Sequence, residues 1–130
     1  MTPAPRVERL TVRLTTVGAK SGEPRPVTLY AFADGDFADG DALVVVGSLG
    51  GSARNPAWVH NLRANPVASL TVGKTTRRVR AREVGGQERQ QLWALVAAGY
   101  PMYAAFQRRT KRVIPLFVLD AVVAEGARRR

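Results

Sequence analysis

Residues 67–83 read VASLTVGKTTRRVRARE and set the fold class of this 130-residue chain. Two segments of strand-forming residues, 67–72 and 75–83, flank the turn pair Gly73-Lys74. The second segment alternates arginine with Val79 and Ala81, and a period of two places every other side chain on the same face of a strand. The pattern predicts an antiparallel hairpin with one strongly basic face.

Three more strands are expected upstream of this hairpin. Alternating apolar and polar residues at 10–15 predict a half-buried strand that ends near Gly18. Two glycines and two prolines in residues 17–26 predict a loop, and the apolar run 27–33 then predicts the second strand. Residues 42–48 are too short and too valine-rich for a helix, so they are expected to form a third strand that is buried on both faces.

The segment between residue 48 and the hairpin is expected to contain a short helix. Asn55 is predicted to be its N-cap and Pro56 its first helical residue, and Pro66 is predicted to end it.

Two further helices and a last strand are expected after the hairpin. Apolar residues with helical spacing predict a helix over residues 87–98, and a second over about 102–109. The apolar run 113–123 predicts a sixth strand, with Pro115 either on an edge strand or where the strand begins. We therefore expect one α+β domain over residues 1–130: a small, mostly antiparallel six-stranded barrel with short helices between the strands, a leader at 1–9 and a basic tail at 121–130.

The formal net charge is +10, from 20 basic and 10 acidic residues. Four of the acids lie in residues 32–41, where Phe-Ala-Asp-Gly-Asp occurs twice in tandem, and we assign this duplication no function. Such a surface attracts polyanions, which leaves nucleic acid, an anionic membrane, or a coenzyme with phosphate and carboxylate groups, while a merely solvated arginine-rich surface remains equally open. The absence of cysteine and of any run of about 20 apolar residues suits a cytoplasmic protein.

Hydrolytic and metal chemistry have no support in the sequence. His60 is the only histidine, and no cysteine exists to complete a metal site with it, so no metal is expected. No carboxylate lies where it would orient His60 for a Ser-His-acid triad. His60 is expected to be structural or part of a pocket wall.

Two segments remain as candidates for binding. Residues 18–25, GAKSGEPR, offer backbone N–H groups, a hydroxyl and two cations between two predicted strands, which is a composition that can hold a phosphate. In the second segment, Gly50 and Gly51 allow a planar ligand to approach the backbone closely, before the helix that carries Trp58. Each of these signals is weak when taken alone.

Five separated segments together carry a family resemblance. In chain order they are LTTVGAKSGEPR (14–25), SLGG (48–51), NPAWVHNLRANP (55–66), YPMY (100–103) and IPLFVL (114–119).

This ordered set resembles the deazaflavin (F420)-dependent nitroreductases, also described as F420H2-dependent quinone reductases, over residues 10–120. The resemblance implies a split β-barrel, the reduced deazaflavin coenzyme F420 with its phosphate and oligoglutamate tail, and hydride transfer to a quinone, enone or nitro compound. Position by position, it implies a phosphate loop, a loop beside the deazaflavin, two coenzyme contacts on the short helix, and two catalytic or pocket-lining tyrosines. In that order these residues are Lys20, Ser21 and Arg25; Ser48, Gly50 and Gly51; Trp58 and Asn61; Tyr100 and Tyr103.

Three positions depart from the family pattern. Ala19 stands where arginine is usual, Leu49 where lysine is usual, and Phe106 where some members have tyrosine. The expected partner is a small electrophile and not nucleic acid, because the basic stripe at 78–82 has no interleaved aromatic residues. A non-catalytic carrier of a flavin or deazaflavin, and a basic polyanion-binding module, are the alternatives. Contact with an anionic membrane and the oligomeric state are left open.

Overall fold

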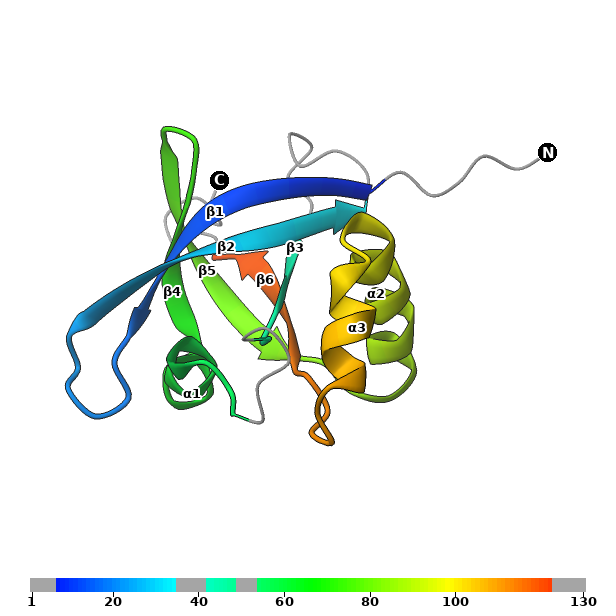
Figure 1. Cartoon of the computed structure of the whole chain (residues 1–130). Coiled ribbons are helices and arrows are strands. Elements are labelled where there is room, and N and C mark those ends of the chain that lie inside the picture. Colours follow the sequence, from blue (N-terminus) through cyan, green and yellow to red (C-terminus); the bar gives the residue numbers. More distant parts are fainter. Residues whose placement is uncertain (1–6, 35–41, 49–53, 123–130) are drawn as a thin grey trace.

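The computed structural model describes residues 7–34, 42–48 and 54–122, and its six described strands form a closed barrel in the order β1-β2-β3-β6-β5-β4 (Figure 1). All of the strand pairs are antiparallel. The α+β class and the six-stranded antiparallel barrel are therefore confirmed. The strands are β1 (Val7–Val17), β2 (Pro24–Asp34), β3 (Leu43–Val46), β4 (Val67–Val72), β5 (Thr75–Glu83) and β6 (Leu116–Ala121), and the helices are α1 (Ala57–Ala64), α2 (Gly86–Gly99) and α3 (Met102–Arg108).

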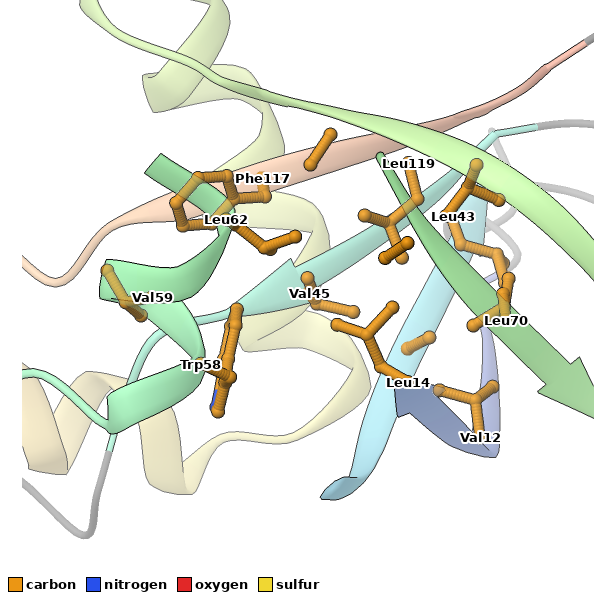
Figure 2. Close-up of a cluster of buried hydrophobic side chains, with 14 of the residues drawn as sticks. Val12, Leu14, Leu43, Val45, Trp58, Val59, Leu62, Leu70, Phe117 and Leu119 are labelled. Carbon is orange, nitrogen blue, oxygen red and sulfur yellow. The ribbon is translucent and has the colours of Figure 1, made fainter. Parts of the chain in front are cut away.

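The interior of the barrel holds one of two hydrophobic clusters. Leu14, Val45, Leu70 and Leu119 are buried there, at positions that alternate along their strands as the sequence pattern predicts. Helix α1 closes one end of the barrel with its apolar face, as Figure 2 shows for Trp58 and its neighbours. This packing fixes the position of α1 next to the β1–β2 loop (Figure 1).

The second cluster lies between the outside of the barrel and the pair of helices α2 and α3. Phe32 of β2 and Val96 of α2 have no exposed surface in it, and Tyr103 of α3 is buried as well. Figure 1 shows α2 and α3 side by side, away from α1. The two helix groups therefore cover different parts of the barrel.

Three details differ from the sequence predictions. Asn55 is not the N-cap of α1: Pro56 holds that position without a side-chain hydrogen bond, and Asn55 Oδ1 instead accepts a bond from Arg112 Nη1 (2.6 Å). Strand β1 begins at Val7 rather than Leu10, because Val7 to Arg9 pair with β2 although they lie outside the alternating segment. Strand β2 begins at Pro24 rather than at residue 27, because residues 24–26 pair with β1 although a loop was predicted there. Pro115 directly precedes β6, which is the start-of-strand position that the sequence predicted as one of two alternatives.

Candidate coenzyme site

The loop between β1 and β2 is a tight turn that depends on two glycines. The Gly18 N–H donates to the Glu23 carbonyl (2.8 Å), and the Gly22 N–H donates to the Gly18 carbonyl (2.9 Å). Gly22 has a positive φ of 72°, which side chains other than glycine rarely adopt. A Cβ atom at Gly18 would lie 2.5 Å from Ser21 Oγ. The glycines therefore allow the loop to fold back on itself.

The hydrogen bonds of this turn leave two adjacent backbone donors for a ligand. The Ala19 N–H donates to Asn61 Oδ1 (3.0 Å), and the Glu23 N–H donates to Ser21 Oγ (3.1 Å). Within the described part of the chain, the N–H groups of Lys20 and Ser21 have no protein partner. Successive free N–H groups in a turn form a concave site for an anion.

Two cations flank these donors. The side chains of Lys20 and Arg25 are exposed, and Arg25 Nη2 donates to Ser21 Oγ (3.2 Å). Neither cation forms an ion pair with any residue in the described ranges. Their charge is therefore available to a bound anion.

A pocket of about 860 Å³ opens between this loop and α1. The loop side contributes Lys20, Ser21 and Arg25, and the helix side contributes Trp58 and Asn61. The pocket surface is mostly apolar, and its volume lies in the range of pockets that enclose coenzyme-sized ligands. Five of the coenzyme residues predicted from the sequence thus come together around one pocket.

Trp58 links the pocket to the barrel core. It is only 5% exposed, and its ring lies 5.9 Å from the ring of Phe117, centroid to centroid. An indole held in this way forms a rigid aromatic wall. His60 lines the same pocket, as the pocket-wall interpretation predicted, while its side chain remains exposed.

The structure adds one buried polar residue, directly behind the pocket lining, that the sequence interpretation missed. Thr16 lies on the inward face of β1, which continues the series Leu10, Val12 and Leu14, and it has no exposed surface. A polar residue at the end of an apolar alternating series was the signal that could have identified it.

The remaining predicted residues are not part of this pocket. Ser48 is half-buried and does not line it, and Gly50 and Gly51 lie outside the described residues. Tyr100 and Tyr103 are in the second hydrophobic cluster, at the α2–α3 side of the barrel.

The two tyrosines belong to an edge-to-face aromatic group. Their ring centroids are 5.1 Å apart, and the Tyr103 ring is 5.7 Å from that of Phe32. Burial, more than the neighbouring tyrosines, raises the pKa of Tyr103 to about 12. Tyr100 is partly exposed and packs against Tyr30, and the Arg9 guanidinium lies over both of those rings.

The described residues contain no group of three side chains suited to a metal ion, and none of their helices is long and apolar enough to cross a bilayer. Fold and site together define a class: a small closed-barrel protein with a pocket whose donors, cations and aromatic wall suit an anionic, aromatic organic ligand.

Known proteins that are similar to this chain indicate which family within this class it belongs to. The F420H(2)-dependent quinone reductase family matches residues 5–121. An F420H(2)-dependent quinone reductase of Mycobacterium tuberculosis (strain ATCC 25618 / H37Rv) is 40% identical over 110 residues, which cover 82% of this chain and 70% of that protein. A solved structure of an F420-H2 dependent reductase (FDR-A) superposes with a TM-score of 0.74 at 37% identity and covers 85% of this chain and 93% of its own. A second, described as a domain-swapped dimer, has a TM-score of 0.75 at 37% identity, with coverages of 85% and 79%.

The chain belongs to the F420H(2)-dependent quinone reductase family. It is an oxidoreductase whose coenzyme is F420 and whose reaction is hydride transfer to a quinone. The residues present fit this coenzyme, because the mostly apolar pocket carries two cations without ion-pair partners in the described ranges and two adjacent N–H donors that suit its phosphate.

Proposed function

We propose that the pocket between the β1–β2 loop and α1 is the coenzyme site, with the phosphate at Lys20, Ser21 and Arg25 and the deazaflavin beside Trp58. The observation that carries this proposal is that one pocket wall combines two cations with two backbone N–H groups that have no partner among the described residues. A phosphate held by charge-assisted bonds at one end leaves the planar part of the coenzyme to pack on the apolar wall.

The protein's tasks in the reaction are binding and orientation. When it is bound, the coenzyme supplies the hydride. The loop residues anchor the anionic portion, and the rigid Trp58 ring limits how a planar ligand can lie in the pocket. The apolar lining excludes water from one side of the ligand. Together these contacts restrict the ligand to few orientations, which is the main catalytic contribution expected of the chain.

A proton must also reach the reduced acceptor, and we assign its delivery to solvent rather than to Tyr103. A phenol with a pKa of about 12 is a poor acid near neutral pH, and Tyr103 is only 7% exposed. Its proposed role is to shape the aromatic cluster. Tyr100 is more accessible, so a relay through its hydroxyl remains our second candidate.

The proposed acceptor range extends from quinones to nitro compounds and enones. Catalysis by positioning needs no acceptor-specific acid or base, so any electron-poor acceptor that reaches the bound coenzyme qualifies. An assay of the purified protein with reduced coenzyme F420 tests the range. Menadione, a nitroaromatic compound and a cyclic enone are compared by the rate at which each oxidises the reduced coenzyme. Oxidation by menadione alone would restrict the function to quinones.

The same assay separates catalysis from simple carriage of the coenzyme. If the protein is a catalyst, the rate of menadione reduction rises in proportion to the protein concentration. NADPH as sole reductant is expected to give no turnover, because the chain lacks a G-x-G-x-x-G turn between a strand and a helix. Tight binding of the coenzyme without faster menadione reduction would contradict catalysis and identify the chain as a carrier.

A further inference from the structure

Apart from the aromatic residues, Thr16 of β1 and Asn61 of α1 are the two buried polar side chains in the described part of the chain. Thr16 has no exposed surface and Asn61 is 8% exposed. Buried polar groups are costly unless they are hydrogen-bonded, so the partners of this pair indicate what it does.

Hydrogen bonds join the pair to the start of β2 and to the turn of residues 18–23, which we call the anion-binding turn. Asn61 Nδ2 donates to Thr16 Oγ1 (3.0 Å), and Thr16 Oγ1 donates to the carbonyl of Arg25 (3.3 Å). On its other side, Asn61 Oδ1 accepts the bond from the Ala19 N–H (3.0 Å). The series of bonds thus runs from the start of β2, through Thr16 and Asn61, to the turn itself.

This arrangement decides which backbone donors face a ligand. The Ala19 N–H is occupied by Asn61, so the N–H groups of Lys20 and Ser21 are the donors left on that side of the turn. Thr16 in turn orients the amide of Asn61, because its hydroxyl accepts from Nδ2 and thereby fixes Oδ1 toward Ala19.

We propose that Thr16 and Asn61 are positioning residues that hold the anion-binding turn at a fixed distance and orientation from α1, and so set the affinity for the coenzyme. This inference rests on the proposed coenzyme site. It assigns a role to Thr16, which has no exposed surface through which to touch a ligand. It also assigns the Asn61 amide to the protein's own backbone, whereas the family resemblance implied a coenzyme contact.

The decisive variant is Thr16→Val, which keeps the shape of the side chain and removes its hydroxyl. We expect the Kd for the coenzyme, measured by calorimetry, to rise tenfold or more. Amide hydrogen exchange at Ala19 is expected to be at least tenfold faster, because Asn61 loses the group that orients it. The single-turnover hydride rate at saturating coenzyme is expected to stay within threefold of the parent, since the reacting groups are unchanged.

Two controls separate positioning from general destabilisation. Thr16→Ser restores the hydroxyl and is expected to bring the Kd back within threefold of the parent. Thr71→Val removes a hydroxyl from the Thr71–Thr76 pair (2.8 Å) on the β4–β5 hairpin, outside the pocket, and is expected to leave the Kd unchanged.

A Thr16→Val protein with faster exchange at Ala19 but a Kd within twofold of the parent would overturn the inference. A Thr16→Ser protein that binds as weakly as Thr16→Val would do the same, since it would identify the methyl group rather than the hydroxyl. If Thr16→Val does not fold, Asn61→Leu is measured with the same readouts and the same limits. A parent protein that binds no coenzyme would instead contradict the proposed coenzyme site.

Discussion

The pocket at the β1–β2 loop and the cluster beneath α2 and α3 lie on the same barrel but are built in opposite ways. The pocket has polar groups with unused capacity: two N–H donors and two cations without ion-pair partners in the described ranges. The cluster has aliphatic side chains and aromatic rings that pack edge to face, including the ring of a phenol whose pKa burial raises to about 12. The region suited to a ligand is therefore distinguished by polar groups that lack protein partners in the described ranges, and not by how densely its side chains pack.

The cations of the chain also differ in whether a protein acid pairs with them. On the basic face of β5, Arg82 forms ion pairs with Glu88 (2.9 Å) and Asp120 (3.4 Å). Arg63 at the end of α1 is held by both carboxylate oxygens of Glu83. These cations are partly neutralised by protein acids, whereas Lys20 and Arg25 have no acidic partner among the residues that the structure describes. The location of unpaired charge is more informative about function than the total of +10.

Among the variants that distinguish the pocket from the α2–α3 cluster, Phe32→Ala is expected to have the largest effect, on the free energy of unfolding. Phe32 is fully buried against Tyr103, so its loss is expected to lower the free energy of unfolding by about 3–5 kcal/mol. Urea unfolding measures this change. The coenzyme Kd of the fraction that remains folded is expected to stay within twofold of the parent, and a large loss of affinity would show that the regions are not independent.

Arg25→Ala is the reciprocal change in the pocket. Removal of a charge-assisted bond is expected to weaken coenzyme binding by about 1.5–3 kcal/mol, with little effect on the free energy of unfolding because Arg25 is exposed. Calorimetry gives the Kd, and high salt is expected to weaken the parent's binding as well. Arg82→Ala is the matched control and should bind normally. Equal losses in both variants would indicate a diffuse electrostatic effect.

Alkaline pH is expected to act on the aromatic cluster through Tyr103. Because its folded pKa is raised to about 12, the stabilisation is fully present below the unfolded pKa of about 10 and is lost as the pH rises toward 12. Between pH 9 and 11 this group contributes a loss of about 1.4 kcal/mol in the free energy of unfolding. Tyr103→Phe should lack this part of the pH dependence. Parallel profiles for the two proteins would contradict the assigned burial.

The smallest effect is expected for the exposed ion pair between Arg63 and Glu83. Its hydrogen bond raises the pKa of Arg63, but both side chains are about two-fifths exposed. Glu83→Gln is therefore expected to lower the free energy of unfolding by less than about 1 kcal/mol. A larger loss in urea unfolding would mean that the pair helps to hold α1, and with it the pocket, in place.

Much of this architecture follows from local sequence pattern. The alternation at 10–15 and at 67–83 identified strands, and β3 is buried on both faces as its valine-rich run predicted. The start of α1 was predicted less well, because Asn55 bonds to Arg112, which is distant in the sequence and invisible to a local capping rule. Long-range pairing likewise extends β1 back to Val7.

The site residues also fall into two groups: those that the local sequence indicates, and those that only the fold brings together. Lys20, Ser21 and Arg25 are close together in the sequence, so the composition of their loop already indicated anion binding. Thr16 becomes meaningful only through its bond to Asn61, because the fold brings together residues that are 45 positions apart. The separation of Tyr100 and Tyr103 from the pocket is also a property of the barrel, which places α3 and α1 on different faces.

The coenzyme is proposed to bind between the β1–β2 loop and α1. The most direct test of this proposal is an NMR titration of the isotope-labelled protein with oxidised coenzyme F420, followed at the backbone amides and at the Trp58 indole. We expect the largest shifts at the Lys20 and Ser21 amides and at the Trp58 indole N–H, with Tyr103 nearly unchanged. Shifts confined to α2 and α3, with Lys20 and Ser21 unmoved at saturation, would contradict this account.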